Sequence, residues 1–189
     1  MNIEKVKKIC KDERCIIKTK IVKDGEHVAS TIGTGTAQYF MGDGFPELSA
    51  SELADVFGIP EEKESEYFLA NRMSESNIFY DSVYPGKEEA VFEEPLRLCE
   101  ERVWSIFRSE RGNTYFAETN CLKPFEKEEL DIRYFAYIDG ASKYLRVFCG
   151  FYLIAVILLD SVPKEINRIC REIARIDVMG VSEEDEDDE

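Results

Sequence analysis

Histidine is almost absent from this chain, since His27 is the only one among 189 residues. It lies in the sequence KDGEH, beside an Asp24-Gly25 turn signal, where an imidazole is solvated rather than held against a nucleophile. No two cysteines are spaced as CxxC, so a structural zinc site is not expected. The glycines match neither GxGxxG nor GxxxxGK(S/T), which argues against a nucleotide-phosphate loop.

Long apolar runs are also missing. The most apolar stretch, FYLIAVILL at 151–159, has nine residues, whereas a membrane-spanning helix needs about 20. It is rich in β-branched and aromatic residues and is predicted to be a buried strand. The opening MNIEKVKK has no apolar signal region, so we expect a cytoplasmic protein with reduced cysteines. These are Cys10, Cys15, Cys99, Cys121, Cys149 and Cys170.

Positive charge is scarce as well. The chain has 24 Lys and Arg against 39 Asp and Glu, a formal net charge of −15. Such a surface repels nucleic acid and anionic lipid on average. Seven of the acids lie in the terminal SEEDEDDE at 182–189, which we expect to be a disordered acidic tail. The tail either keeps the chain in solution or attracts a basic partner surface.

The remaining pattern predicts an α+β fold, an antiparallel sheet with two to four helices. We expect a single domain over 1–181, in two similar halves at about 1–74 and 96–178 with an exposed connector at 75–95. Ser49 and Glu52 form a capping box, and the charged segment 60–74 favours a short helix beginning at Pro60. The other predicted elements are a helix at 2–10, a strand at 15–22, a hairpin turn at Asp24-Gly25, a bulged strand and turn at GTGT (33–36), a hairpin over 102–118, strands over 132–148 around Asp139-Gly140, and a helix after Pro163.

Carboxylates are abundant, but most lie in turns or on polar helix faces, where a solvated charge is the expected state. We therefore expect no catalytic, cofactor-binding or metal-binding residues, and no enzyme; an undetected hydrolase is the enzyme-class alternative. Trp104 is interpreted as part of a core layer, with a partner-binding patch as the alternative.

Several segments resemble a loosely related group of uncharacterised proteins from bacterial prophages and mobile elements. They are EKVKKICK at the start, GTGTAQYFMGDGFPEL, GNTYFAETNCLKPF, and the closing apolar strand and helix. The group implies no assigned activity.

The second half is also similar to the end of a DNA sliding-clamp domain. The similar pieces are GNTYFAETNCLKPF and FYLIAVILLDSV, although Leu159-Asp160 stands where that family has Met-Pro. The resemblance implies clamp-like halves, a ring-forming homo-oligomer and basic helices that face DNA. The candidate interaction residues are then Lys5, Lys7 and Lys8 on the first helix and Arg168, Arg171 and Arg175 on the last, with Trp104 as a separate candidate.

Together these observations favour a non-enzymatic, phage-type accessory protein that acts by protein binding, with a sliding-clamp-like domain in DNA metabolism. One alternative is an acidic inhibitor that mimics nucleic acid and occupies a site on a host protein. A small virion structural component is the other. A protein partner is expected, nucleic acid only through the basic helices, and neither a membrane nor a cofactor.

Overall fold

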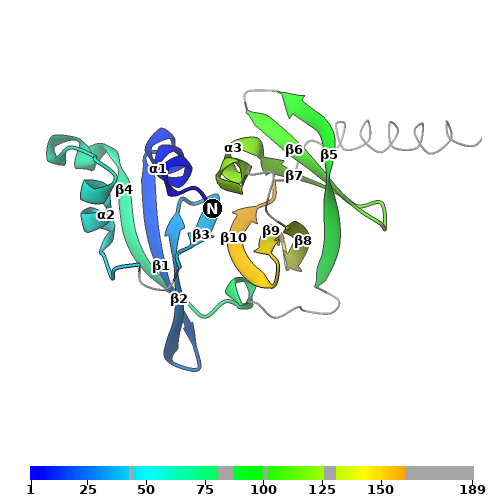
Figure 1. Cartoon of the computed structure of the whole chain (residues 1–189), viewed down its shortest axis with the longest axis horizontal. Helices are drawn as coiled ribbons and strands as arrows, with labels where there is room; N and C mark the ends of the chain where they lie inside the picture. The colour runs from blue at the N-terminus through cyan, green and yellow to red at the C-terminus, as the bar shows by residue number, and fades with distance from the viewer. Residues whose placement is uncertain (43–44, 81–86, 100–101, 126–130, 161–189) are drawn as a thin grey trace, which may run out of the picture.

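A computed structural model describes residues 1–42, 45–80, 87–99, 102–125 and 131–160. Ten strands form one sheet in the order β4-β1-β2-β3-β10-β9-β8-β5-β6-β7, antiparallel throughout except for the parallel β1–β4 pair. This confirms the predicted α+β class (Figure 1). The strands are β1 (Cys15–Lys23), β2 (Glu26–Gly33), β3 (Ala37–Phe40), β4 (Phe68–Ser74), β5 (Glu88–Cys99), β6 (Val103–Ser109), β7 (Thr114–Glu118), β8 (Ile132–Asp139), β9 (Ser142–Cys149) and β10 (Tyr152–Leu158).

Within the described ranges, three short α-helices lie beside the sheet, α1 (Ile3–Asp12), α2 (Ala50–Val56) and α3 (Thr119–Leu122). The Asn2 side chain accepts hydrogen bonds from the free backbone N–H groups of Glu4 and Lys5 in the first turn of α1. The predicted capping box of Ser49 and Glu52 forms at the N-terminus of α2. Three 3₁₀ turns complete the described elements, namely η1 (Glu61–Glu66), η2 (Asn77–Phe79) and η3 (Lys123–Phe125). No helix of the described ranges is long and apolar enough to span a membrane.

The short helix expected from Pro60 is present as the 3₁₀ turn η1, with Pro60 at its N-cap, and Phe68–Ser74 then pairs with β1 as β4. One expectation about the middle of the chain is wrong. The connector is shorter than 75–95, because β5 begins at Glu88. Pro95 fits inside β5 because it lies where the register with β6 shifts between Glu93 and Arg97, and proline is tolerated at such a bulge.

The β3–β10 pair joins the first four strands to the last six, so the sheet is continuous (Figure 1). On one face the helices and both groups of strands share a single core cluster, which includes Ile9, Leu53, Tyr39 and Leu122. A smaller cluster around Tyr137 and Phe148 packs on the opposite face of β8, β9 and β10 with η2. The seam between β3 and β10 is therefore buried under helices of both groups.

Candidate functional site

The outer edge of β4 is an open sheet edge: β4 is the last strand on its side, so no described strand pairs with it. The Phe68 N–H donates to the Arg14 carbonyl at 2.9 Å, on the β1 side. In a parallel strand the backbone N–H and C=O groups of every second residue point to the same side. Since Phe68 faces β1, Leu69, Asn71 and Met73 direct these groups away from β1, toward the open edge. These groups are available to another extended chain.

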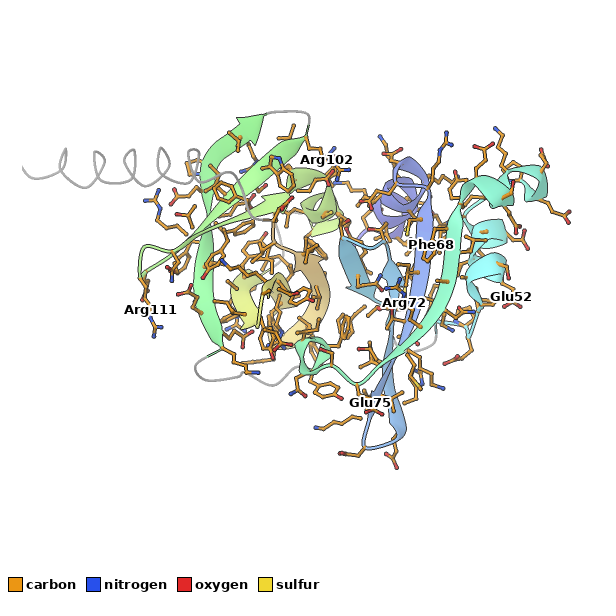
Figure 2. All side chains as sticks on the ribbon, turned by 180° about the vertical axis from the view of Figure 1, so that it is seen from behind. Glu52, Phe68, Arg72, Glu75, Arg102 and Arg111 are labelled. Atoms are coloured by element: carbon orange, nitrogen blue, oxygen red, sulfur yellow. The ribbon has the colours of Figure 1, made fainter. Side chains whose placement is uncertain are left out.

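The side chains of β4 make this edge more apolar than an ordinary one. Phe68 is 55% exposed and Met73 is 71% exposed, and Arg72 is the only charged residue of the strand. Figure 2 shows Phe68 and Arg72 along β4, Glu75 just beyond its end, and Glu52 on the neighbouring helix α2. Edge strands are normally protected by charged residues, proline or a covering element. At this edge α2 lies beside β4, where the Ala50 N–H donates to Oδ1 of Asn71 at 3.0 Å, but β4 contains no proline and no described strand covers it.

A hollow lies on each face of the sheet beside the second half of β4. One has a volume of about 520 Å³ and is lined by Asn71 and Met73 together with Lys20 and Glu52. The other, of about 340 Å³, lies against Ser74, Thr19, Gln38 and Phe79. An extended segment added along β4 would direct successive side chains to opposite faces, toward one hollow and then the other.

Charge is distributed unevenly along the edge. The turn η1, immediately before β4, carries four glutamates and one lysine, namely Glu61, Glu62, Lys63, Glu64 and Glu66. Of these, Glu66 forms an ion pair with Arg14 at 3.1 Å. Beside the second half of β4, Lys18 pairs with Glu47 at 3.2 Å, and this ammonium lowers the pKa of the Glu47 carboxyl. The edge is therefore acidic at its start and nearly balanced at its end.

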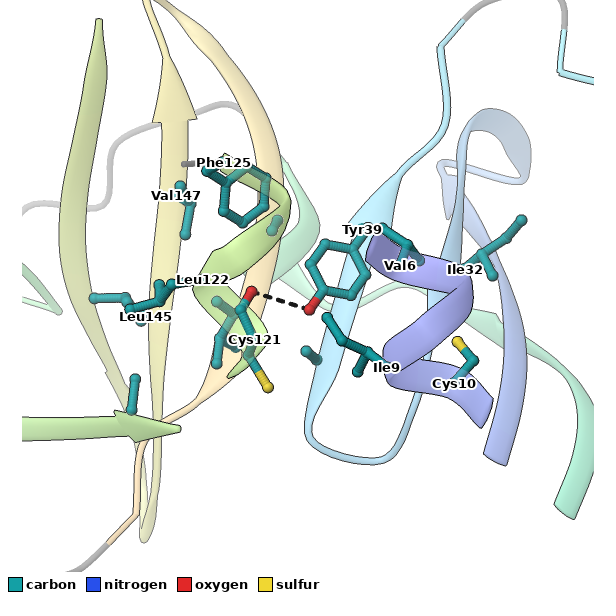
Figure 3. Close-up of a cluster of buried hydrophobic side chains, with 14 of the residues drawn as sticks. Val6, Ile9, Cys10, Ile32, Tyr39, Cys121, Leu122, Phe125, Leu145 and Val147 are labelled. Atoms are coloured by element: carbon teal, nitrogen blue, oxygen red, sulfur yellow. Dashed lines mark hydrogen bonds between the residues drawn. The ribbon is translucent and has the colours of Figure 1, made fainter. Parts of the chain in front are cut away.

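A second group of reactive side chains lies at the seam between the two groups of strands. Glu13 follows α1, Glu118 ends β7 and Cys121 lies in α3, and their ligand atoms are all within 4.8 Å of one another. The Tyr39 hydroxyl donates to the Cys121 carbonyl oxygen at 3.0 Å, which fixes α3 against β3 (Figure 3). Burial is the largest cause that raises the pKa of both the Cys10 and Cys121 thiols to about 12, so both are protonated at neutral pH.

These thiols predict a loss of stability in alkali. Because their pKa rises from 9.0 to about 12 on folding, the native chain keeps protons that the unfolded chain releases. The free energy of unfolding should therefore fall as pH increases from about 9 toward 12, by at most about 1.4 kcal/mol per pH unit for each thiol. Urea unfolding at several pH values, with EDTA present to remove metal ions, measures this fall in the free energy of unfolding. The fall should be shallower in Cys121→Ala and unchanged in Cys149→Ser; equal slopes in all three proteins would contradict the assignment.

The structure describes some of the predicted interaction residues. Lys5 donates to the Lys123 carbonyl at 2.8 Å, Lys7 pairs with Glu4 at 3.0 Å, and Lys8 is exposed. Trp104 is half-buried in β6 and pairs across the hairpin with Glu118 rather than with an aromatic residue. The other basic helix and the acidic tail, that is Arg168, Arg171, Arg175 and residues 182–189, lie outside the described residues.

Sequence reasoning missed both the β4 edge and the seam cluster. The glutamates of η1 lie just before FLANRMS at 68–74, so the sequence reads as one charged segment and the strand is hidden in it. The signal that could have revealed the strand is the break at Pro60 followed by the apolar residues Phe68 and Leu69. In the cluster of Glu13, Glu118 and Cys121, the last two residues are three apart in the chain, but Glu13 comes from a distant segment and no local spacing connects it to them. Comparisons with protein-family models, with curated proteins and with solved structures find no match.

Proposed function

We propose that this chain is a non-enzymatic accessory protein that binds an extended segment of another protein along the outer edge of β4. The observation that carries this proposal is an open, nearly uncharged edge with Phe68 and Met73 exposed and a hollow on each face. Strand addition derives its affinity from main-chain hydrogen bonds and its specificity from alternate side-chain sites, and this edge supplies both.

The charge beside the edge defines the chemistry of the partner. The glutamates of η1 flank the start of β4, so the partner should carry Lys or Arg at that end and apolar residues toward Met73. The formal net charge of −15 would draw such a cationic partner at long range. This form of the proposal includes the acidic inhibitor, which would occupy a basic surface of a host protein.

A clamp-like ring is the second candidate, since a sheet with edges at both ends allows copies to pair head to tail. However, the other end of the sheet is partly occupied: the Asp160 N–H donates to the Phe116 carbonyl oxygen of β7 at 3.0 Å. This contact favours a foreign partner at β4 over a β4–β7 pairing between copies. Light scattering at two salt concentrations separates the two, because a stable ring of three or more copies supports the clamp and a monomer supports the foreign partner.

The edge can be blocked with one substitution. Met73→Pro removes an outward N–H and an exposed apolar side chain, and the ladder with β1 does not use that N–H. We expect the unfolding midpoint to change little. Peptides selected from a displayed library of random decapeptides on the wild-type chain should be rich in apolar residues with Lys or Arg toward one end. Their affinity for Met73→Pro, measured by fluorescence anisotropy, should be at least about tenfold weaker, the equivalent of one net hydrogen bond or more.

The matched control is Val28→Ser, which removes another exposed apolar strand side chain outside β4 without a change of charge and should leave the affinity unchanged. A library that yields no binder, or binders with equal affinity for wild type and Met73→Pro, would refute the β4 site.

A further inference from the structure

The cluster of Glu13, Glu118 and Cys121 at the seam combines two kinds of metal-ligand atom. Glu13 and Glu118 provide carboxylate oxygens and Cys121 a sulfur, all within 4.8 Å of one another. Glu13 is the C-cap of α1, Glu118 ends β7 and Cys121 lies in α3, so the end of the first helix and the second group of strands converge on one point. Tetrahedral ligands about 2.0–2.3 Å from zinc are about 3.3–3.8 Å from one another, so these atoms are close enough for small side-chain movements to bring them onto one ion.

The surroundings hold the carboxylates in place. The Thr36 hydroxyl lies 3.0 Å and 3.2 Å from the two carboxylate oxygens of Glu13 and donates to that group. Arg102 donates to Oε2 of Glu118 at 2.7 Å, which holds that carboxylate in place. A metal-ligating carboxylate is typically oriented by such a second hydrogen bond.

An open hollow connects this cluster with solvent. It has a volume of about 400 Å³ and is lined by Glu13 and Glu118 together with Ile9, Asp12, Arg102 and Asn120. Three of these six residues are acidic and one is basic, so a cation is favoured along the path. The buried Cys121 lies at the inner end of the cluster, so the site has both an entry and a closed end.

We infer that Glu13, Glu118 and Cys121 bind one Zn²⁺ ion, with water in the fourth position. The mixed set selects zinc because a thiolate is a poor ligand for Mg²⁺ and Ca²⁺, whereas zinc accepts sulfur and carboxylate together. On coordination the Cys121 sulfur exchanges its proton for the metal, and the proton leaves to the buffer. The ion would link α1 to β7 and α3 across the seam, independently of the β4 proposal.

The test uses the full chain and Co²⁺ as a spectroscopic substitute for Zn²⁺. We expect one equivalent of Co²⁺ to produce a sulfur-to-cobalt charge-transfer band, and one equivalent of Zn²⁺ to remove it. Cys121→Ser should abolish the band, and Glu13→Gln should weaken binding strongly. The matched controls are Cys149→Ser and Glu4→Gln, a thiol and a helix α1 carboxylate outside the cluster, which should behave like wild type.

Thr36→Val keeps all three ligands and removes the hydroxyl that contacts Glu13, Thr34 and the Cys121 side chain. It tests the site without removing a ligand, so its result does not depend on how well the ligand variants fold. We expect binding about 10–100-fold weaker with the band still present. The inference is overturned if no charge-transfer band forms, if the band survives Cys121→Ser, or if Cys149→Ser removes it. Peptide binding at β4 should be the same with and without zinc, so the two proposals fail separately.

Discussion

Replacement of Arg146 by methionine should lower the free energy of unfolding by about 3–5 kcal/mol. Arg146 is fully buried on β9, and its Nη1 donates to the Glu88 carboxylate at 2.6 Å, whose side chain is only 2% exposed. Its Nη2 donates to the Tyr80 carbonyl oxygen, just before the segment that leads to β5. The rings of Tyr137 and Phe148 lie against the guanidinium. The substitution leaves the Glu88 carboxylate buried without its guanidinium, which is why the expected loss is large.

Urea unfolding followed by circular dichroism measures this loss. Arg108→Met is the matched control, because Arg108 also pairs with a glutamate of β5, Glu94 at 3.1 Å, but both side chains remain more than a quarter exposed. A pair of that kind contributes about 0–1 kcal/mol. The double variant Glu88→Leu/Arg146→Met removes both charges and should recover most of the loss. Equal losses for Arg146→Met and Arg108→Met would show that the buried pair has no special role.

The sequence does not predict the buried ion pair of Arg146 and Glu88, because it does not show which strand face is covered. In SKYLRVFC, Tyr144, Arg146 and Phe148 are two residues apart and share one face of the strand. The same pattern is found in strands whose charged face is exposed to solvent. The face is buried because η2 and the Tyr80 region lie over it, and this contact joins segments far apart in the chain. Periodicity reports that residues share a face, but not what covers that face.

Local signals, by contrast, predicted much of the fold. The turn at Asp24-Gly25 has both residues at positive φ, 52° and 84°, which is the geometry that makes this dipeptide a hairpin signal. The Asp139-Gly140 turn and the hairpin around Gly112 form as expected. The buried strand predicted at 151–159 corresponds to β10, although Phe151 and Tyr152 at its start are exposed. Each of these depends on neighbours within a few residues.

The candidate sites depend on contacts between distant segments, and these were not predictable. β4 becomes an edge because it pairs in parallel with β1, and no local pattern chooses a partner some 50 residues earlier in the chain. Glu13 reaches Glu118 and Cys121, which are only three residues apart in the chain, because the β3–β10 pair brings α1 and α3 over the same seam. The absence of CxxC spacing therefore bears on sites built from one segment, not on this one.

Replacement of Gly33, beside the seam, by alanine should lower the free energy of unfolding by about 3 kcal/mol. This is the upper end of the usual cost of forcing an extra methyl group into a packed site. Gly33 ends β2 and pairs with Gln38 at the start of β3. A Cβ at this position would lie 1.9 Å from the Ala37 carbonyl oxygen, which is part of the backbone and cannot rotate away. That oxygen accepts the Thr34 N–H at 2.8 Å, so relief of the clash must move β3, the strand that pairs with β10.

Gly35→Ala is the matched control in the same GTGT turn. No atom lies within 4 Å of a Cβ at Gly35, and its φ is outside the left-handed region, so alanine should be neutral or stabilise by less than about 1 kcal/mol. The two variants separate the steric role of Gly33 from any general need for glycine in the turn. Because a shift of β3 also displaces Tyr39 from Cys121, Gly33→Ala should weaken Co²⁺ binding at the seam whereas Gly35→Ala should not. If the two variants have the same unfolding midpoint, the tight β2–β3 turn does not hold the seam together.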